Sequence, residues 1–232
     1  MKLLAIDTSS LACSVALQID DDVFERHEER AREHTRLLTP MIRDVLAEGG
    51  CALPELDGIV LGNGPGSFIG MRIAASVAQG LAHGAGLPIV PVSSLAAIAA
   101  QVFAETEARQ VIVAQDAHMN EVYLGGYFRG DANIPEPMFD ERLHGHMPIA
   151  ELDRNGASGR IAAGAGWQRY PELTALNEQQ FERFSDILHP RASFLLAMGA
   201  AALRLGHSVD PEDLVPAYLR HKVAEKPAPD NP

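Results

Sequence analysis

A run of polar residues directly follows the first apolar segment, and its residue types could bind an anion or a metal-bound water. Asp7, Thr8 and Ser9 stand between the apolar segments Lys2–Ile6 and Ala12–Ile19. In a hairpin, the backbone N–H groups and hydroxyls of such a turn can face a phosphate, and an acid at the strand end can hold a metal-bound water. The alternative is a polar turn in which Asp7 accepts backbone hydrogen bonds. Because short hydroxyl-rich turns are common, the motif alone favours a turn without a ligand.

The most distinctive stretch is glycine-rich and reads GNGPGS over residues 62–67. Gly64 and Gly66 allow a tight turn and a close approach to another group. Ser67 is a good N-cap for the helix that follows, and a helix N-terminus behind a glycine-rich loop can bind an anion. The stretch lacks the Gly-Lys-Ser/Thr ending of a Walker A loop and the spacing of a dinucleotide fingerprint. A tight strand-to-helix connection without a ligand is an equally good interpretation.

Metal ligands and catalytic nucleophiles are not indicated by the remaining residues. Among nine histidines, only His144 and His146 form a close pair, without an acid or cysteine at ligand spacing, so we expect no metal site. Ser93 and Ser94 open a predicted helix, where a capping role is more common than a nucleophilic one. The sequence contains neither a GxSxG nor a His-Glu-x-x-His motif.

The order of elements that must position these residues is β-β-β-α-β-α-β-α in the first half. Strands that alternate with helices predict an α/β fold with a mixed sheet and helical cover. Pro40 either begins the first helix or kinks a longer one. The predicted elements, in order, are Lys2–Ile6, Ala12–Ile19, Val23–Arg30, the helix Glu33–Glu48, Asp57–Leu61, a helix from Ser67 to about Gly86, Leu87–Val92 and the helix Ser93–Ala104.

A second unit begins near Arg109, where buried strands are again predicted. We expect two subdomains, 1–106 and 107–222, followed by a disordered tail over 223–232. The proline-containing stretch Gly130–Asn155 is expected to form an irregular edge. The other predicted elements are the strands Val111–Gln115, Glu121–Phe128 and Arg160–Ala163 and the helix Ala192–Leu205.

Two of the predicted helices carry a face that could contact another protein. In Glu33–Glu48 the apolar residues recur about one turn apart, and in the next helix small residues recur every fourth position. Such a ridge lets a partner helix approach closely, whereas the alternative is an ordinary helix packed on its own sheet. The candidate interface residues are Leu38, Met41, Ile42 and Val45 in the first helix and Gly70, Ala74, Ala78 and Ala82 in the second.

Composition excludes several classes of protein. The 232-residue chain is 47% hydrophobic and has no apolar run long enough to span a bilayer, so we expect no membrane association. Its N-terminus is typical of a first strand rather than a secretory signal, which predicts a cytoplasmic protein. A net charge of −12 disfavours independent binding to nucleic acid, because the chain as a whole repels phosphates. The two cysteines, Cys13 and Cys51, are expected to stay reduced.

The chain resembles the bacterial TsaB (YeaZ) family over most of its length. The resemblance is carried by LLAIDTSSLACSVAL, REHTRLLTPMI, GNGPGSFIGMRIAASVAQGLAHGAGLPIVPVSSLAA, DAHMNEVY, AGWQRYP and VPAYLRHKVA. Asn63, Ile69 and His118 depart from the residues that are more frequent in this family. The resemblance implies an actin-like ATPase-domain (ASKHA, RNase H-like) fold with two subdomains. It also implies a role in forming N6-threonylcarbamoyladenosine at position 37 of tRNAs that read codons starting with A.

The resemblance further implies partners: the catalytic subunit TsaD, the ATPase TsaE, and tRNA through the complex. TsaD is a relative that opens with a motif of the form IETSCDETGVA, and its second and third acids fall on Leu11 and Ala12. Its two metal-binding histidines fall on Ser94 and Ile98, and a late aspartate falls near Arg191. Since these side chains cannot hold the same ion, the resemblance implies a non-catalytic subunit without a cofactor of its own.

Alternatives remain open at this point. The first alternative to a non-catalytic subunit is an ATPase or sugar-kinase-like enzyme of the same superfold. The second alternative is a metallopeptidase, which the missing histidine pair opposes. A homodimer and ATP or ADP bound at the subunit interface are also left open. The residues that would face a nucleotide or phosphate are Asp7, Thr8, Ser9, Gly64, Gly66 and Ser67.

Overall fold

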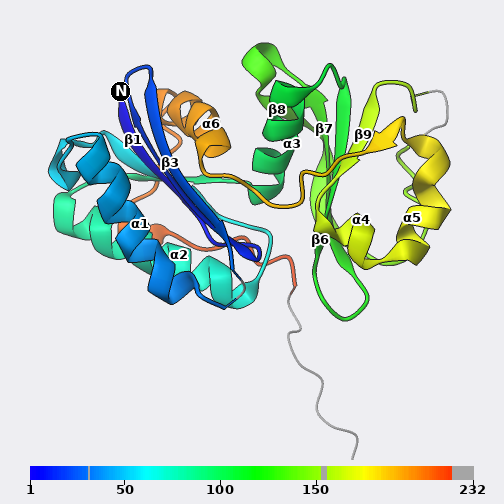
Figure 1. The fold of residues 1–232 in the computed structure, drawn as a ribbon, viewed down its shortest axis with the longest axis horizontal. Coiled ribbons are helices and arrows are strands. Elements are labelled where there is room, and N and C mark those ends of the chain that lie inside the picture. The colour runs from blue at the N-terminus through cyan, green and yellow to red at the C-terminus, as the bar shows by residue number, and fades with distance from the viewer. Residues whose placement is uncertain (31, 153–155, 221–232) are drawn as a thin grey trace, which may run out of the picture.

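The chain forms two lobes, each built on a five-stranded sheet (Figure 1). The structure is a computed structural model that describes residues 1–30, 32–152 and 156–220. In the first sheet the strand order is β3-β2-β1-β4-β5, where the first three strands are antiparallel and β4 and β5 run parallel to β1. These strands are β1 (Lys2–Asp7), β2 (Ala12–Ile19), β3 (Asp22–Glu29), β4 (Gly58–Gly62) and β5 (Ile89–Val92).

Helices cover both faces of the first sheet, which explains why its central strands are continuously apolar. On β1, Leu4 and Ile6 point into one core, whereas Leu3 and Ala5 point into another. The first core is closed by α1 (His34–Glu48) and α2 (Phe68–Ala85), and the second by α6 (Ser193–Arg204). A strand buried on both faces needs apolar residues at every position.

The local signals for the helix ends are confirmed. The Ser67 hydroxyl accepts a hydrogen bond from the Gly70 N–H at the start of α2, and Gly86 ends this helix in the left-handed conformation. Pro40 lies inside α1, which confirms the longer of the two helices considered.

The second sheet repeats the plan of the first, with the strand order β10-β9-β6-β7-β8. It is covered on one face by α3 (Ser94–Glu105) and on the other by α4 (Ala165–Arg169) and α5 (Pro171–Asn177). The strands are β6 (Gln110–Asp116), β7 (Val122–Arg129), β8 (Pro135–His144), β9 (Arg160–Ala163) and β10 (Arg183–Phe184). Short 3-10 turns lie at Leu53–Glu55, Asp131–Asn133, Glu178–Gln180 and Pro211–Asp213.

The prediction of an irregular edge over Gly130–Asn155 is confirmed for the edge position but wrong in expecting no regular strand there. Ten of these residues form β8, whose only strand neighbour in the described sheet is β7. Pro135 and Pro137 are compatible with a strand here because an edge strand leaves alternate N–H groups unpaired.

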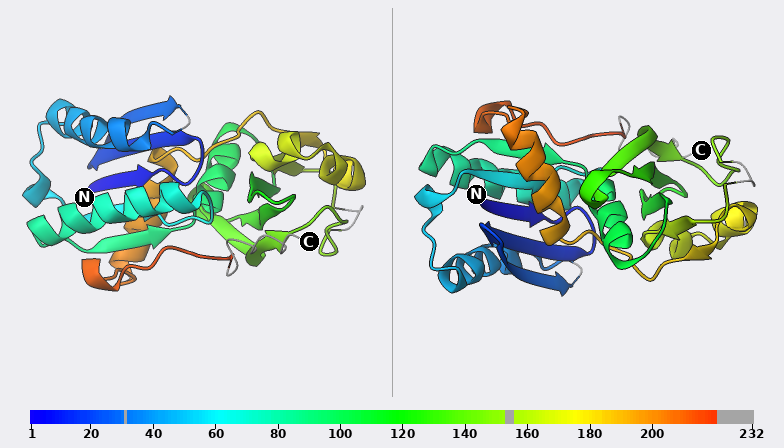
Figure 2. Two further views of the ribbon diagram at one scale, coloured as in Figure 1. Left: turned by 90° about the horizontal axis from the view of Figure 1, so that it is seen from below. Right: turned by 90° about the horizontal axis from the view of Figure 1, so that it is seen from above.

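The predicted division at residues 106 and 107 does not describe how the lobes are built. Helix α3 from the first half packs on the second sheet, while α6 from the second half packs on the first sheet (Figures 1 and 2). On α6, Leu195 and Leu196 share a core with Leu3 and Val60 of the first sheet. The first lobe therefore needs residues far beyond 106, and the predicted tail over 223–232 lies outside the described residues.

Within the described ranges, no helix has the length and hydropathy required to cross a membrane.

Candidate functional site

The polar turn after β1 is buried and fully engaged by other parts of the chain. Asp7 Oδ1 accepts hydrogen bonds from the N–H and the hydroxyl of Ser9, each at 2.8 Å. Asp7 Oδ2 accepts a hydrogen bond from the Ser94 hydroxyl at 2.6 Å, at the start of α3. The Thr8 hydroxyl donates to the Gly70 carbonyl at 2.7 Å. Asp7 is only 1% exposed, so this carboxyl has no direct access to solvent.

The glycine-rich segment lies directly on this turn, and its glycines are required by the contact. A Cβ atom on Gly66 would stand 2.2 Å from the Ser9 carbonyl oxygen, and one on Gly70 would stand 1.9 Å from the Thr8 carbonyl oxygen. The Ser67 N–H donates to the Ser9 carbonyl at 2.6 Å. The two segments therefore bind each other directly.

The predicted phosphate-facing residues are brought together, but their polar groups bind one another. Gly64 donates its N–H to the Ser94 hydroxyl at 3.1 Å and accepts from the Ser94 N–H at 2.8 Å. Burial raises the pKa of Asp7 to about 6, and the hydrogen bonds from Ser94 and Ser9 oppose that rise. This arrangement supports the interpretation that needs no ligand.

A second carboxyl, which is partly buried, is bound by the residue next to Ser94 and was not indicated by any sequence motif. Glu141, on β8, accepts hydrogen bonds from the hydroxyls of Ser93 and Tyr127. Burial raises the pKa of Glu141 above its ordinary value, and it also raises the pKa of Tyr127. Ser93 and Ser94 thus hold one carboxyl from each sheet, which links the two lobes at the N-terminus of α3. No local pattern reveals this pair, because Glu141 is 48 residues from Ser93 in the sequence.

The residues predicted to contact a partner are instead part of the core. The apolar faces of α1 and α2 pack on one face of the first sheet, so these side chains are covered by their own chain. The prediction of a partner surface at these positions is corrected accordingly. The buried residues are Leu38, Met41, Ile42 and Val45 in α1 and Gly70, Ala74, Ala78 and Ala82 in α2.

The opposite side of α2 is accessible and is both small and apolar. Ser76, Gly80 and Gly84 recur every fourth residue there, and a Cβ atom on Gly80 or Gly84 would meet no atom within 4 Å. Beside them run half-buried apolar residues that continue from Ile69, which is 70% exposed. We call this surface the outer face of α2. Its apolar members are Ile69, Ile73, Val77 and Leu81.

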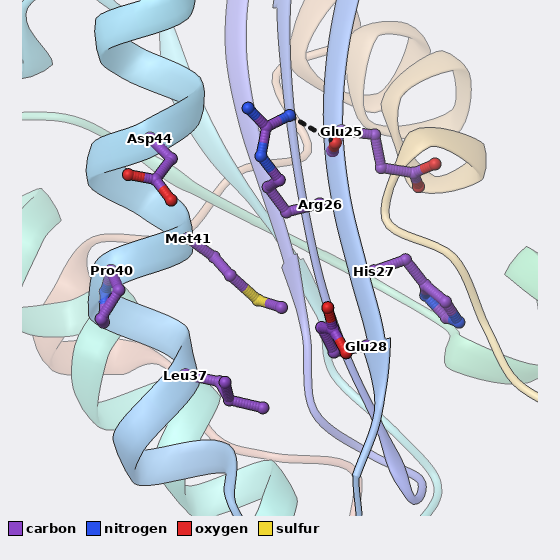
Figure 3. A pocket seen from close by; sticks show the side chains of 8 residues that line it. All are labelled: Glu25, Arg26, His27, Glu28, Leu37, Pro40, Met41 and Asp44. Atoms are coloured by element: carbon purple, nitrogen blue, oxygen red, sulfur yellow. Dashed lines mark hydrogen bonds between the residues drawn. The ribbon is translucent and has the colours of Figure 1, made fainter.

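A groove of about 410 Å³ separates β3 from α1 (Figure 3). Leu37, Pro40 and Met41 provide its apolar side, and the rest of its lining is polar or charged. Arg26 pairs with Glu48 at 2.5 Å, so its guanidinium is already neutralised within the chain. The groove is an open feature of the first lobe and lies apart from the Asp7 turn.

Comparisons with known proteins agree with this architecture. Residues 27–227 match the family model described as TsaD: tRNA N6-adenosine threonylcarbamoyltransferase. The tRNA threonylcarbamoyladenosine biosynthesis protein TsaB of Escherichia coli is 36% identical, with 99% of both chains covered. The protein of the same name from Haemophilus influenzae is 35% identical, with 99% of this chain and 98% of the relative covered. The chain belongs to the TsaB (YeaZ) family.

Solved structures of family members have the same fold. YeaZ from Pseudomonas aeruginosa superposes with a TM-score of 0.81 at 35% identity, over 92% of this chain and 98% of that one. A second Pseudomonas aeruginosa structure, described as an uncharacterized protein similar to peptidase YEAZ, gives a TM-score of 0.85 at 37% identity, over 94% and 99% of the two chains. The actin-like fold implied by the resemblance is thereby confirmed.

The resemblance aligned Ser94, Ile98 and Arg191 with metal ligands of TsaD, and in this chain all three make contacts within the fold. Ser94 binds Asp7, Ile98 is completely buried in an apolar core, and Arg191 pairs with Glu25 at 2.5 Å. Over the described parts of the chain, no group of three histidine, cysteine, aspartate or glutamate side chains is arranged to hold a metal ion. The His144 imidazole instead contacts the Met147 carbonyl at 3.1 Å.

Proposed function

We propose that this TsaB-family protein acts in threonylcarbamoyladenosine formation in tRNA as a non-catalytic subunit that supports a TsaD-like catalytic subunit. The observation that carries the proposal is that Ser94 and Ile98 are buried, with Ser94 bound to Asp7. The resemblance aligns these two residues with the metal-binding histidines of TsaD. Acyl transfer from an adenylate develops negative charge that a bound metal ion can stabilise. The side chains of Ser94 and Ile98 cannot bind such an ion as a pair of histidines would.

The outer face of α2 is the surface that we assign to the TsaD-like partner. Small residues such as Gly80 and Gly84 let another helix approach closely, and Ile73 and Val77 offer apolar area that becomes buried on contact. The partner surface is thus still assigned to α2, as predicted from the sequence. It lies on the outer face of this helix and not on the face that was predicted. A homodimer through the same face would compete with the heterodimer. A TsaE-like ATPase and tRNA would join once the two subunits are assembled.

The proposal assigns no cofactor to the isolated chain. The Asp7–Ser9 turn and the glycine-rich segment bind each other through the Ser67 N–H and the Ser9 carbonyl, which disfavours the alternative of a nucleotide-binding ATPase or sugar-kinase-like enzyme. ATP or ADP would then belong to the interface with the catalytic subunit. A cytoplasmic location is part of the same proposal.

The test is reconstitution of tRNA modification with each component left out in turn. We expect the activity to require this protein together with the TsaD-like and TsaE-like subunits, and the pure protein to show none. Modification that persists without this protein, or magnesium-dependent ATP turnover by the protein alone, would contradict the proposal.

Two arginine substitutions on one helix test the assigned surface. Gly80→Arg adds a large cation to the outer face of α2, so we expect a folded protein that no longer binds the TsaD-like subunit. Ala78→Arg places an unpaired charge in the core, so we expect loss of the fold itself. Circular dichroism and co-purification distinguish the two results, and a folded Gly80→Arg protein that still binds would exclude this face.

A further inference from the structure

Arg72, on the exposed side of α2, has a guanidinium group that two aromatic rings hold in place. Its Cζ lies 3.8 Å from the centroid of the Phe68 ring and 5.9 Å from that of Tyr218. Its Nε donates a hydrogen bond to the Tyr218 hydroxyl at 3.1 Å. Stacking on an aromatic face and one fixed donor orient the planar group, so its outer N–H groups have a defined direction.

The tyrosine that fixes Arg72 is itself held by the glycine-rich segment. The Ala217 N–H donates to the Asn63 carbonyl at 3.0 Å, and the Asn63 side-chain amide donates to the Val215 carbonyl at 3.0 Å. The C-terminal segment around Tyr218 is thereby attached to the loop that precedes α2. The Phe68–Arg72–Tyr218 arrangement thus joins two parts of the chain that are distant in sequence.

This oriented cation has no acidic partner within the described chain. Neither Nη atom of Arg72 makes a hydrogen bond to a described residue, and no described carboxylate lies within 4 Å of it. By contrast, Arg191 and Arg220 are each paired with a glutamate, at 2.5 and 2.6 Å. Other described arginines, such as Arg204, also lack an ion pair, but the guanidinium of Arg72 is in addition fixed between the Phe68 and Tyr218 rings.

We propose that Arg72 is a docking site for a carboxylate side chain of the protein that binds the outer face of α2. The two free Nη groups match the two oxygens of an aspartate or glutamate, and the guanidinium is already ordered before binding. Ile69, which is 70% exposed one turn away, provides an adjacent apolar contact. Because Arg72, Ser76 and Gly80 follow one another at four-residue spacing, a partner lying along this face reaches all three.

A protein carboxylate fits this position better than an RNA phosphate. A backbone carrying many phosphates would be repelled by the net charge of −12, and RNA binding requires a cluster of basic residues. The arginine nearest the end of the described chain, Arg220, is bound to Glu121 and to the Ala117 carbonyl. It is therefore occupied within the chain. A single carboxylate on a protein partner needs only the one oriented cation.

The inference rests on the proposed function, and the experiment separates the two. The dissociation constant for the TsaD-like subunit of the same organism is measured by calorimetry for the wild type, Arg72→Gln and Arg72→Lys. Arg204→Gln, an exposed arginine on α6, is the matched control. We expect Arg72→Gln to weaken binding about tenfold or more and Arg204→Gln to leave it unchanged. Arg72→Lys should also weaken binding, because an ammonium group cannot present two parallel donors.

Salt provides a second readout. Raising the ionic strength should weaken binding of the wild type more than binding of Arg72→Gln, because only the wild type keeps the charge pair. Equal salt dependence, or an affinity of Arg72→Gln within twofold of the wild type, would overturn the inference and leave the proposed function intact. A wild type that does not bind the TsaD-like subunit overturns both. Binding of tRNA by the isolated wild type that is lost in Arg72→Gln would identify a phosphate instead, and would also overturn the carboxylate assignment.

Discussion

Two opposing effects set the pKa of Asp7: its hydrogen bonds favour the charged carboxylate, and its burial favours the neutral carboxyl group. Burial is the larger effect and raises its pKa from 3.8 to about 6. Between those pH values the folded state binds a proton that the unfolded state releases. The contribution of Asp7 to stability is therefore complete below about pH 4 and is lost as the pH rises through about 6. Over this interval the difference amounts to about 3 kcal/mol.

Asp7→Asn should remove this pH dependence. An asparagine oxygen can still accept from Ser9, and its amide group can donate to the Ser94 hydroxyl. We expect the wild type to lose stability relative to Asp7→Asn between pH 4 and pH 7, as measured by urea unfolding at both pH values. Asp44→Asn, which removes an exposed carboxyl, is the control and should follow the wild type. Parallel curves for the wild type and Asp7→Asn would show that the buried carboxyl does not titrate in this range.

At the scale of single residues, the sequence identified the polar turn after β1 but not the residues that bind it. Asp7, Thr8 and Ser9 were recognisable because three polar residues follow an apolar strand. Ser94 was not recognisable as a partner of Asp7, because the two residues are 87 positions apart. Glu141 was not recognisable as a partner of Ser93, because these residues are 48 positions apart. Side chains that meet only through the folding of the whole chain leave no local pattern.

At the scale of single elements, α2 shows which features a sequence can predict. Its cap at Ser67 and its end at Gly86 follow from local backbone chemistry, so both were predicted. The sequence did not predict which of the two ridges of small residues on α2 faces the sheet. The residues Gly70, Ala74 and Ala78 have the same spacing as Ser76, Gly80 and Gly84. The choice depends on the sheet that packs against the helix.

Two glycine-to-alanine changes in α2 should therefore have opposite effects on stability. Gly70→Ala places a Cβ atom 1.9 Å from the Thr8 carbonyl oxygen, so we expect destabilisation by at least about 1–3 kcal/mol. Gly80→Ala meets no neighbouring atom and restores helix propensity, so we expect stabilisation by up to about 1 kcal/mol. Thermal unfolding followed by circular dichroism measures both. Equal effects of the two substitutions would mean that α2 is rotated relative to its position in this structure.

At the scale of the whole molecule, two helices are exchanged between the lobes. Helix α3 follows β5 of the first sheet but covers the second sheet, and α6 returns to cover the first (Figure 1). A division of the sequence at residues 106 and 107 missed this exchange, because hydrophobic periodicity indicates that a helix has an apolar face but not which sheet receives it. The exchange places α3 and α6 side by side between the two sheets.

This arrangement predicts that the two lobes unfold together. Trp167, the only tryptophan, lies buried in the second lobe and reports on it by fluorescence. Phe24→Trp in a Trp167→Phe background moves the reporter to the first lobe. We expect both proteins to show one transition with fluorescence and circular dichroism coincident, because α3 and α6 pack against each other and each completes a core.

Met198 on α6 provides the sharper test, since its half-buried side chain packs against cores of both lobes. Met198→Ala should lower the unfolding midpoint seen by the Trp167 reporter and by the Phe24→Trp reporter by the same amount. Leu176→Ala, at an exposed side chain of α5, is the control and should leave both midpoints nearly unchanged. If Met198→Ala shifted only the first-lobe reporter, the lobes would be independent folding units. An equal shift of both unfolding midpoints would mean that unfolding of one lobe also destabilises the other, because each lobe loses the helix, α3 or α6, that covers its sheet.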